Sequence, residues 1–213
     1  TTGHSQTALG FCALTTATTP EGNTALGNSA MKLTTTGADN VAVGRRALCT
    51  NTTGGNNTSV GPYSMTSNTT GAGNVAVGIQ ALCSNTTASD NVAVGLNALL
   101  ANTTGFCNVA IGKNALLANT TTCKNVAIGS DALCSHTING VENTAVGHGA
   151  QKSNTEGYYN TSVGKNSLVN VTTGDNNISL GRDSGSDAVR NITSGDNEIV
   201  IGNNSNGSAF IKI

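Results

Sequence analysis

The sequence contains no tryptophan, and it is poor in other aromatic residues, in charge and in proline. Among its 213 residues there are three Phe, three Tyr and two Pro, and charged residues make up 10%. So few large side chains cannot fill the wide core of an ordinary globular domain. A disordered polyelectrolyte is also excluded, because such chains are rich in charge and this one is not.

The missing charge and the missing apolar runs also exclude classes of partner. The net charge of -1 provides no basic surface for a phosphate backbone, so we expect no nucleic-acid partner. No stretch approaches the roughly 18 consecutive apolar residues of a membrane span, so we expect no membrane insertion.

What the sequence does contain is one unit, typified by residues 91–107, repeated twelve times. A glycine closes the Val-Ala-Val-Gly run of each copy: Gly10, Gly27, Gly44, Gly61, Gly78, Gly95, Gly112, Gly129, Gly147, Gly164, Gly181 and Gly202. The sequence numbers of successive marker glycines differ by 17 in the first seven steps, and then by 18, 17, 17 and 21. Such a fixed period is the signature of a repeat architecture.

We therefore predict an all-β fold, a β-solenoid of about twelve 17-residue repeats, built either as a parallel β-roll or as a trimeric β-prism. Residues 1–202 form the predicted repeat shaft. Residues 203–213 end in the apolar run Ala209-Phe210-Ile211-Lys212-Ile213, and we expect them to form a C-terminal strand that continues into a further domain.

The residues around each marker glycine predict a strand. The positions one and three before the glycine are aliphatic or Thr in every copy, as in Val92 and Val94, and this is the period-two pattern of a strand. We expect these two columns to face the core. The residue between them is Ala or Ser in eleven copies, which suggests that the opposite face is closely covered as well, by something that one chain does not supply.

Two further features recur in most units. A Leu or Met four residues after the marker glycine, preceded by Ala or Ser, predicts a second short strand in each unit, as at Ala98-Leu99. An Asn four residues before the glycine occurs in ten copies, as at Asn91. It indicates either a ladder of stacked amides or simply a residue that suits a turn.

Units such as Asn40-Val41-Ala42-Val43-Gly44, followed by Ala47-Leu48 and by Asn51-Thr52-Thr53-Gly54, resemble the repeats of phage tail fibres and bacterial surface fibres. The Val-Ala-Val-Gly core is also similar to the head repeats of trimeric autotransporter adhesins, although those repeats are usually shorter. The resemblance implies β-rolls or β-prisms assembled as homotrimers outside a virion or a cell. The self-cleaving chaperone domain that often follows fibre shafts is not present in this sequence.

No catalytic constellation emerges from the sequence. His4, His136 and His148 have no fixed relation to a nucleophile or a paired acid, so we expect no catalytic residues, no metal and no cofactor. Hydrolysis of a glycan by paired carboxylates needs two acids about 5 to 10 Å apart in a cleft. The cluster to check is Asp183, Asp187 and Glu198.

Three other groups of residues are candidate sites. Cys107 and Cys123 lie in the turns of adjacent repeats and differ by one register, so a disulfide between them is sterically allowed. The Asn-Thr-Thr triplets are N-glycosylation acceptors if the chain is a eukaryotic secretory protein, and otherwise they are turn chemistry. They begin at Asn51, Asn68, Asn85, Asn102 and Asn119. Tyr158 and Tyr159 are candidates for stacking on a glycan.

These observations favour a structural and adhesive function, without enzymatic activity. We expect the shaft of a homotrimeric extracellular fibre, on a virion or a cell surface, that presents a receptor-binding tip. Receptor contact is expected at the tip or at the irregular segments 138–141 and 183–191. The alternatives are a monomeric Thr-rich solenoid that binds ice or glycans, and a glycan-degrading tailspike. In the ice-binding alternative, adjacent threonines such as Thr103 and Thr104 point to different sides, so only one of them can lie on a flat face.

Overall fold

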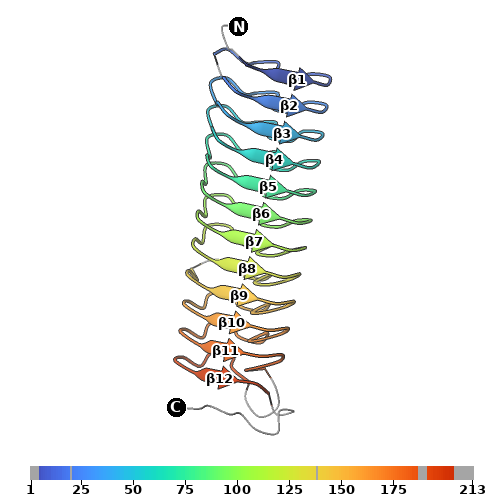
Figure 1. Cartoon of the computed structure of the whole chain (residues 1–213). Coiled ribbons are helices and arrows are strands. Elements are labelled where there is room, and N and C mark those ends of the chain that lie inside the picture. Colours follow the sequence, from blue (N-terminus) through green and yellow to red (C-terminus); the bar gives the residue numbers. More distant parts are fainter. Residues whose placement is uncertain (1–4, 20, 138, 187–190, 204–213) are drawn as a thin grey trace.

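The computed structural model describes residues 5–19, 21–137, 139–186 and 191–203, and in them the chain is a β-solenoid. Each rung, meaning one turn of the solenoid, contributes one three-residue strand (Figure 1). The strands are β1 (Thr7–Leu9), β2 (Thr24–Leu26), β3 (Val41–Val43), β4 (Thr58–Val60), β5 (Val75–Val77), β6 (Val92–Val94), β7 (Val109–Ile111), β8 (Val126–Ile128), β9 (Thr144–Val146), β10 (Thr161–Val163), β11 (Ile178–Leu180) and β12 (Ile199–Ile201). The predicted fold class is confirmed.

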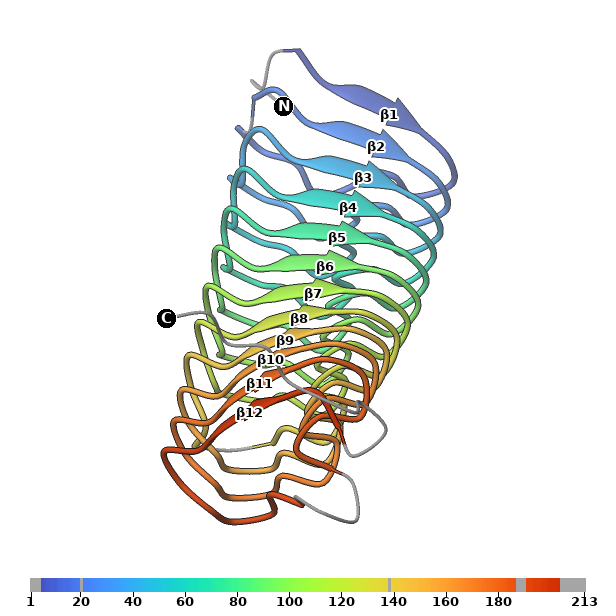
Figure 2. The ribbon, with the colours of Figure 1, turned by 60° about the horizontal axis from the view of Figure 1, so that its bottom comes forward.

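All twelve strands form one parallel sheet in sequence order, from β1 to β12. The register follows the repeat, so that Val75, Ala76 and Val77 lie beside Val92, Ala93 and Val94. One chain closes each rung behind the sheet (Figure 2), so the rungs have the form of a parallel β-roll and are not shared among chains. At about 4.8 Å between strands, the eleven steps give a rod about 50 Å long.

The marker glycine ends each strand for a steric reason. Gly95 has a φ of 134°, and a Cβ on it would lie 2.6 Å from the carbonyl oxygen of Gly112 in the next rung. A side chain at this corner would therefore collide with the backbone of the neighbouring rung, and only glycine allows the rungs to stack so closely.

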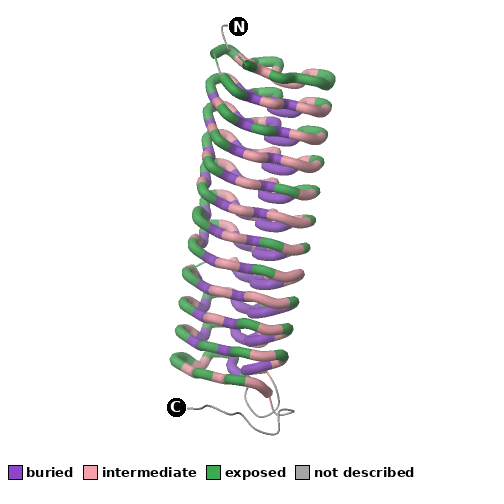
Figure 3. Tube along the Cα trace, viewed as in Figure 1, coloured by how far each residue is buried: buried purple, intermediate pink, exposed green. Residues whose placement is uncertain are grey.

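The strand faces are the reverse of those predicted. The small middle residue of each strand points inward: Ala93 is fully buried, whereas Val92 and Val94 on either side are only half-buried. The buried core is a narrow stack of alanines from the strands and of Ala-Leu or Ala-Met pairs from the opposite wall. The buried stretches recur at the same places in successive rungs (Figure 3). The chain thus covers its own Ala/Ser face, and the aliphatic columns lie outside.

The predicted second strand is also wrong. The segment around Ala98-Leu99 is a turn, with φ of 58° at Asn97 and 52° at Leu99. Its N–H groups point alternately along the axis: Asn97 donates to the Ile79 carbonyl of the preceding rung, and Leu99 donates to the Ala115 carbonyl of the following one. The leucine column is nevertheless fully buried, so the apolar pattern correctly marked the core without marking a strand.

The asparagines four residues before the marker glycine form a buried amide ladder, as in the first of the two interpretations. The Asn91 N–H donates to Oδ1 of Asn74 at 3.0 Å, and Nδ2 of Asn91 donates to the Gly105 carbonyl at 2.9 Å. All ten are fully buried: Asn23, Asn40, Asn57, Asn74, Asn91, Asn108, Asn125, Asn143, Asn160 and Asn177. Each asparagine side chain thus pairs with one backbone carbonyl and one backbone N–H, as Asn91 does with Gly105 and Asn108.

A second amide ladder runs beside the first, and both donate to the same corner carbonyls, as Asn57 and Asn68 do to Gly71. In Asn85, for example, Nδ2 donates to Oδ1 of Asn68 at 2.8 Å and to the Ala88 carbonyl, three residues ahead, at 3.0 Å. The ladder comprises Asn51, Asn68, Asn85, Asn102 and Asn119, all fully buried. These Asn-Thr-Thr asparagines are therefore structural elements of the corner.

In the next rung His136 replaces the asparagine, and here the repeat is longer by one residue. Nε2 of His136 lies 2.7 Å from the carbonyl oxygen of Gly140, four residues ahead instead of three. The longer side chain thus spans the extra residue and keeps the corner carbonyl paired. Beyond Asn154 the column becomes apolar, and Val171 and Ile192 pack on Leu168 in a separate small core.

Two predictions fall partly outside the described residues. Of the predicted C-terminal strand at 203–213, only Asn203 is described. The irregular segments 138–141 and 183–191 are described except at Ile138 and at 187–190. Ser186 and Asn191, on either side of the second gap, form an isolated antiparallel bridge.

Candidate functional site

The outer face of the sheet is a distinctive surface. It consists of the first and third residues of all twelve strands, and we refer to it as the aliphatic face. None of these 24 positions carries a charge or an aromatic ring. Ten of its large apolar side chains are exposed: Leu9, Val41, Val77, Ile111, Ile128, Val163, Ile178, Leu180, Ile199 and Ile201. Such a continuous apolar stripe on the outside of a protein is typical of an interaction surface.

The sequence contained a signal for this arrangement that the prediction did not use. Thr occupies the first strand position in five copies, as at Thr58, whereas the middle position is almost always Ala or Ser. A column that accepts Thr and bulky residues equally is less constrained in volume than one restricted to the smallest side chains. The more constrained column is the one that faces a narrow core.

Tyr158 and Tyr159 lie at the corner that precedes β10. Their ring centroids are 6.1 Å apart and the rings are tilted by 39°. Tyr158 is half-buried and its N–H donates to Oδ1 of Asp175 at 2.8 Å, whereas the Tyr159 side chain is exposed. Of the two predicted glycan contacts, Tyr159 therefore presents its ring to solvent.

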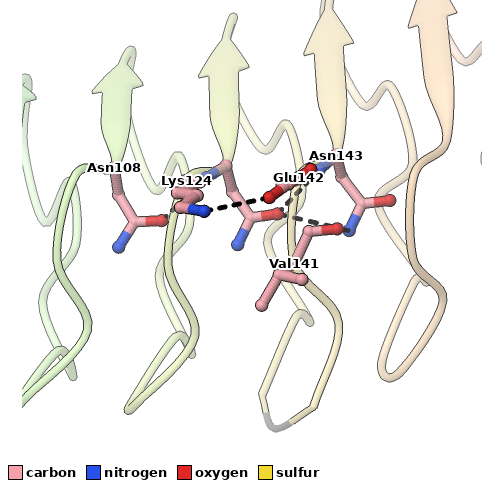
Figure 4. A network of polar contacts seen from close by, with 6 residues as sticks. Asn108, Lys124, Val141, Glu142 and Asn143 are labelled. Atoms are coloured by element: carbon pink, nitrogen blue, oxygen red, sulfur yellow. Dashed lines mark hydrogen bonds and ion pairs between the residues drawn. The ribbon is translucent and has the colours of Figure 1, made fainter.

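An ion pair lies on the same corner. Nζ of Lys124 is 3.1 Å from Oε1 of Glu142 in the next rung, and both side chains are largely exposed (Figure 4). Glu142, through its hydrogen bond and its charge, raises the pKa of Lys124. The pair lies next to the amide ladder, in which Nδ2 of Asn143 donates to Oδ1 of Asn125 at 3.2 Å.

Cys107 and Cys123 are neighbours at this corner, in adjacent rungs, and both are free thiols in the structure. Cys107 is exposed and Cys123 is half-buried. The proposed disulfide is thus not formed here. Cys83 and Cys134, further along the rung, have thiols whose pKa is raised by burial.

The candidate glycosylation acceptors are inaccessible in the folded chain. The side chains of Asn51, Asn68, Asn85, Asn102 and Asn119 are fully buried, and their Nδ2 atoms donate hydrogen bonds within the second ladder. A glycan on any of these atoms would displace a ladder bond and would have to pass through the wall of the rung.

The residues considered for catalysis lie in different surroundings: Asp183 follows β11, whereas Glu198 directly precedes β12. His136 is buried in the ladder and His148 is exposed, while His4 and Asp187 are not described. The Asp183 carboxylate is already engaged by Nε of Arg182 at 3.2 Å and by Nδ2 of Asn166 at 3.0 Å. Among the described residues there is no group of three metal-ligating side chains.

Comparisons of this chain with protein-family models, with curated proteins and with solved structures gave no match. The described residues also include no helix with the length and hydropathy of a membrane span.

Proposed function

We propose that this chain is the shaft of a homotrimeric extracellular fibre, of the phage tail-fibre or surface-adhesin kind, that holds a receptor-binding tip away from its base. The observation that supports the proposal is the uncovered aliphatic face, which runs unbroken along all twelve rungs. The resemblance of the repeats to those of such fibres is consistent with it.

The chemistry of the aliphatic face favours copies of the same chain as its partner. A single solenoid leaves two columns of Val, Ile, Leu and Thr in water along about 50 Å. When copies are related by rotation about an axis parallel to the rod, equivalent rungs of all copies lie at the same position along that axis. Equivalent columns of the aliphatic face therefore meet at every rung. Burying this apolar area stabilises the assembly at roughly 25 cal/mol per Å².

The polarity of a fibre restricts the symmetry. A shaft that presents a tip at one end requires all of its chains to run in the same direction. This requirement excludes a two-fold axis perpendicular to the rod, and it selects rotation about an axis along the rod. Three chains around that axis enclose the aliphatic faces between them and leave the other walls of each rung in contact with solvent.

In this assembly the residues have mechanical roles. The parallel sheet and the two amide ladders connect each rung to the next, and the marker glycines allow the rungs to stack closely. The result is a stiff rod whose stability accumulates rung by rung.

The proposal is tested by the molar mass of the native protein in solution, measured by light scattering. We expect three times the chain mass of 21.2 kDa. The variant Val77→Lys/Val94→Lys places two charges on the aliphatic face and should shift the mass to that of one chain while the circular dichroism spectrum is unchanged. The control variant Thr87→Lys/Thr104→Lys, on exposed residues of another wall, should remain trimeric. A monomeric or dimeric native protein would contradict the proposal.

One observation favours a second candidate function, ice binding. At the corner formed by the Asn-Thr-Thr turns, the second Thr is exposed in seven consecutive rungs, from Thr19 to Thr121. The first Thr, in contrast, donates its hydroxyl to the next rung, as from Thr103 to the Thr120 carbonyl at 3.0 Å. Thermal hysteresis that is lost in Thr87→Lys/Thr104→Lys, in a protein that is monomeric, would establish this function instead.

A further inference from the structure

The residue five positions before each marker glycine, which we call the corner residue, has a left-handed backbone in every rung. In seven rungs it is Gly, Asn or Asp, the residues that adopt this conformation most readily: Gly22, Asp39, Asn56, Gly73, Asp90, Asn176 and Asn197. In the first rung it is Ser5, and in four consecutive later rungs it is again none of these three residue types. There the corner residues are Cys107, Lys124, Glu142 and Tyr159, with φ between 55° and 60°.

The backbone gains nothing from these four side chains. A thiol, an ammonium, a carboxylate and a phenol share no property that favours a left-handed φ, and each is strained relative to the Asn found in other rungs. All four side chains are exposed, so core packing does not explain them either. What they have in common is that they project into solvent from one edge of the rod.

The preceding position changes in the same rungs. In the four preceding rungs it holds Ala38, Gly55, Ala72 and Ser89, and in the two following rungs it holds Asp175 and Asp196. In the four rungs between them it holds Phe106, Cys123, Val141 and Tyr158. Phe106 is 46% exposed. We define these four pairs, 106–107, 123–124, 141–142 and 158–159, as the corner ridge.

A comparable run at another corner shows what distinguishes the corner ridge. Two residues after the marker glycine, Arg46, Tyr63 and Gln80 also have a positive φ. There the guanidinium of Arg45 lies over the ring of Tyr63, 4.6 Å from its centroid, so this ring face is occupied. Tyr159 is 54% exposed and contacts Tyr158 at a tilt, which leaves a face of its ring open.

We propose that the corner ridge is a binding surface for a neutral carbohydrate chain, an inference that rests on the proposed adhesive role and assigns its contact residues. The open Tyr159 ring can pack on the apolar face of a pyranose. The neighbouring Glu142 carboxylate accepts hydrogen bonds from sugar hydroxyls, and the Lys124 ammonium donates to them. These three groups follow one another along two steps of about 4.8 Å, or about 10 Å in total, so they suit an extended oligosaccharide.

The ion pair between Lys124 and Glu142 is the reason for choosing a neutral ligand. The two charges balance each other at 3.1 Å, so the ridge has no excess of either sign to attract a charged polymer. The remaining hydrogen-bonding capacity of both groups is directed to solvent, since both side chains are largely exposed.

The test measures binding of the full chain to immobilised, defined tetrasaccharides of neutral hexoses and of N-acetylhexosamines. The ridge variant carries Cys107→Asn, Lys124→Asn, Glu142→Asn and Tyr159→Asn, which are the residues of the unstrained rungs. We expect its affinity to fall at least tenfold while its Tm rises, on the order of 5 °C, because strain is relieved at four positions.

The matched control is Arg46→Asn/Gln80→Asn, which relieves the same kind of strain at the other corner. It should also raise the Tm, and it should leave binding unchanged. Absence of binding by the wild-type chain to every tetrasaccharide, or equal loss in the control, would overturn the inference. A change of molar mass in the ridge variant would do so too, because it would identify the ridge as a contact between subunits. If the wild-type chain is monomeric but binds through the ridge, the proposed trimer fails and this inference stands.

Discussion

At the scale of single residues, the serines that replace alanine in the strands are paired with a second polar side chain. Where the strand alanine is replaced by Ser59, the alanine opposite is replaced by Ser64, and the two hydroxyls lie 2.6 Å apart. Ser179 likewise bonds to Ser167 at 2.9 Å, and Ser162 receives a hydrogen bond from Gln151 at 3.1 Å. Paired replacement is expected, because an isolated buried hydroxyl would lose its bonds to water without gaining another.

His136 predicts a dependence of stability on pH. Burial lowers the pKa of His136, and because a carbonyl can only accept, Nε2 must carry the proton in its bond to Gly140. Nδ1 is buried, with no hydrogen-bond partner among the described residues. As the pH falls through the ordinary value of about 6.5, the unfolded chain takes up a proton that the folded chain resists, and stability is lost down to the lower folded pKa. The loss is at most about 1.4 kcal/mol at pH 5.5.

The measurement is the free energy of unfolding by denaturant at pH 7.5 and at pH 5.5. The variant His136→Gln, whose amide is long enough to reach Gly140 but does not titrate, should lose most of the difference between the two values. An equal difference in the wild-type chain and the variant would show that other groups cause it.

At the scale of the element, each strand is limited by the width of the rung. Ala93 lies between the strands on either side and the Ala-Leu wall opposite, so one additional branch has no space to enter. We expect Ala93→Val to destabilise the chain by about 1 to 3 kcal/mol through overpacking.

The matched change on the outer face is Val92→Thr, since Thr occupies this column in five rungs. We expect it to change the free energy of unfolding by no more than about 0.5 kcal/mol. Denaturant unfolding of both variants distinguishes the observed faces from the reversed arrangement, in which Val92→Thr would be the damaging change.

At the scale of the whole molecule, the solenoid is a one-dimensional stack in which each rung contacts its neighbours. Deleting residues 75–91 joins Asn74 to Val92 and removes one complete rung, with both amide ladders kept in register. We expect this variant to fold and its Tm to fall by about 5 °C or less.

Deleting only residues 75–90 is the matched control. It shifts the register of the following residues by one, so that side chains that are buried in the wild-type core point outward at the junction. This variant should lose much more stability, as measured by its Tm and its circular dichroism spectrum. Equal stability of the two deletions would show that register is not what holds the rungs together.

The sequence by itself determined the architecture, because the fixed period of the repeat is visible wherever two copies of the unit are aligned. The marker glycines and the buried leucine column around Leu99 could be assigned from identity and spacing, and the Asn91 ladder was one of the two interpretations that its spacing allowed. Each of these features depends on contacts between equivalent positions of neighbouring rungs, and the repeat itself makes such contacts predictable.

Only the tertiary structure decided which face of the strand lies inside, what conformation Leu99 adopts and which side chains the rod presents. Alternation along a strand indicates two faces but does not say which of them is buried, and here the narrow rung places Ala93 inside and Val94 outside. The left-handed backbone at Leu99 and at Tyr159 is imposed by closure of the rung, against the local preference of both residues. Local sequence cannot reveal these features, because their cause is the space that the opposite wall of the rung leaves.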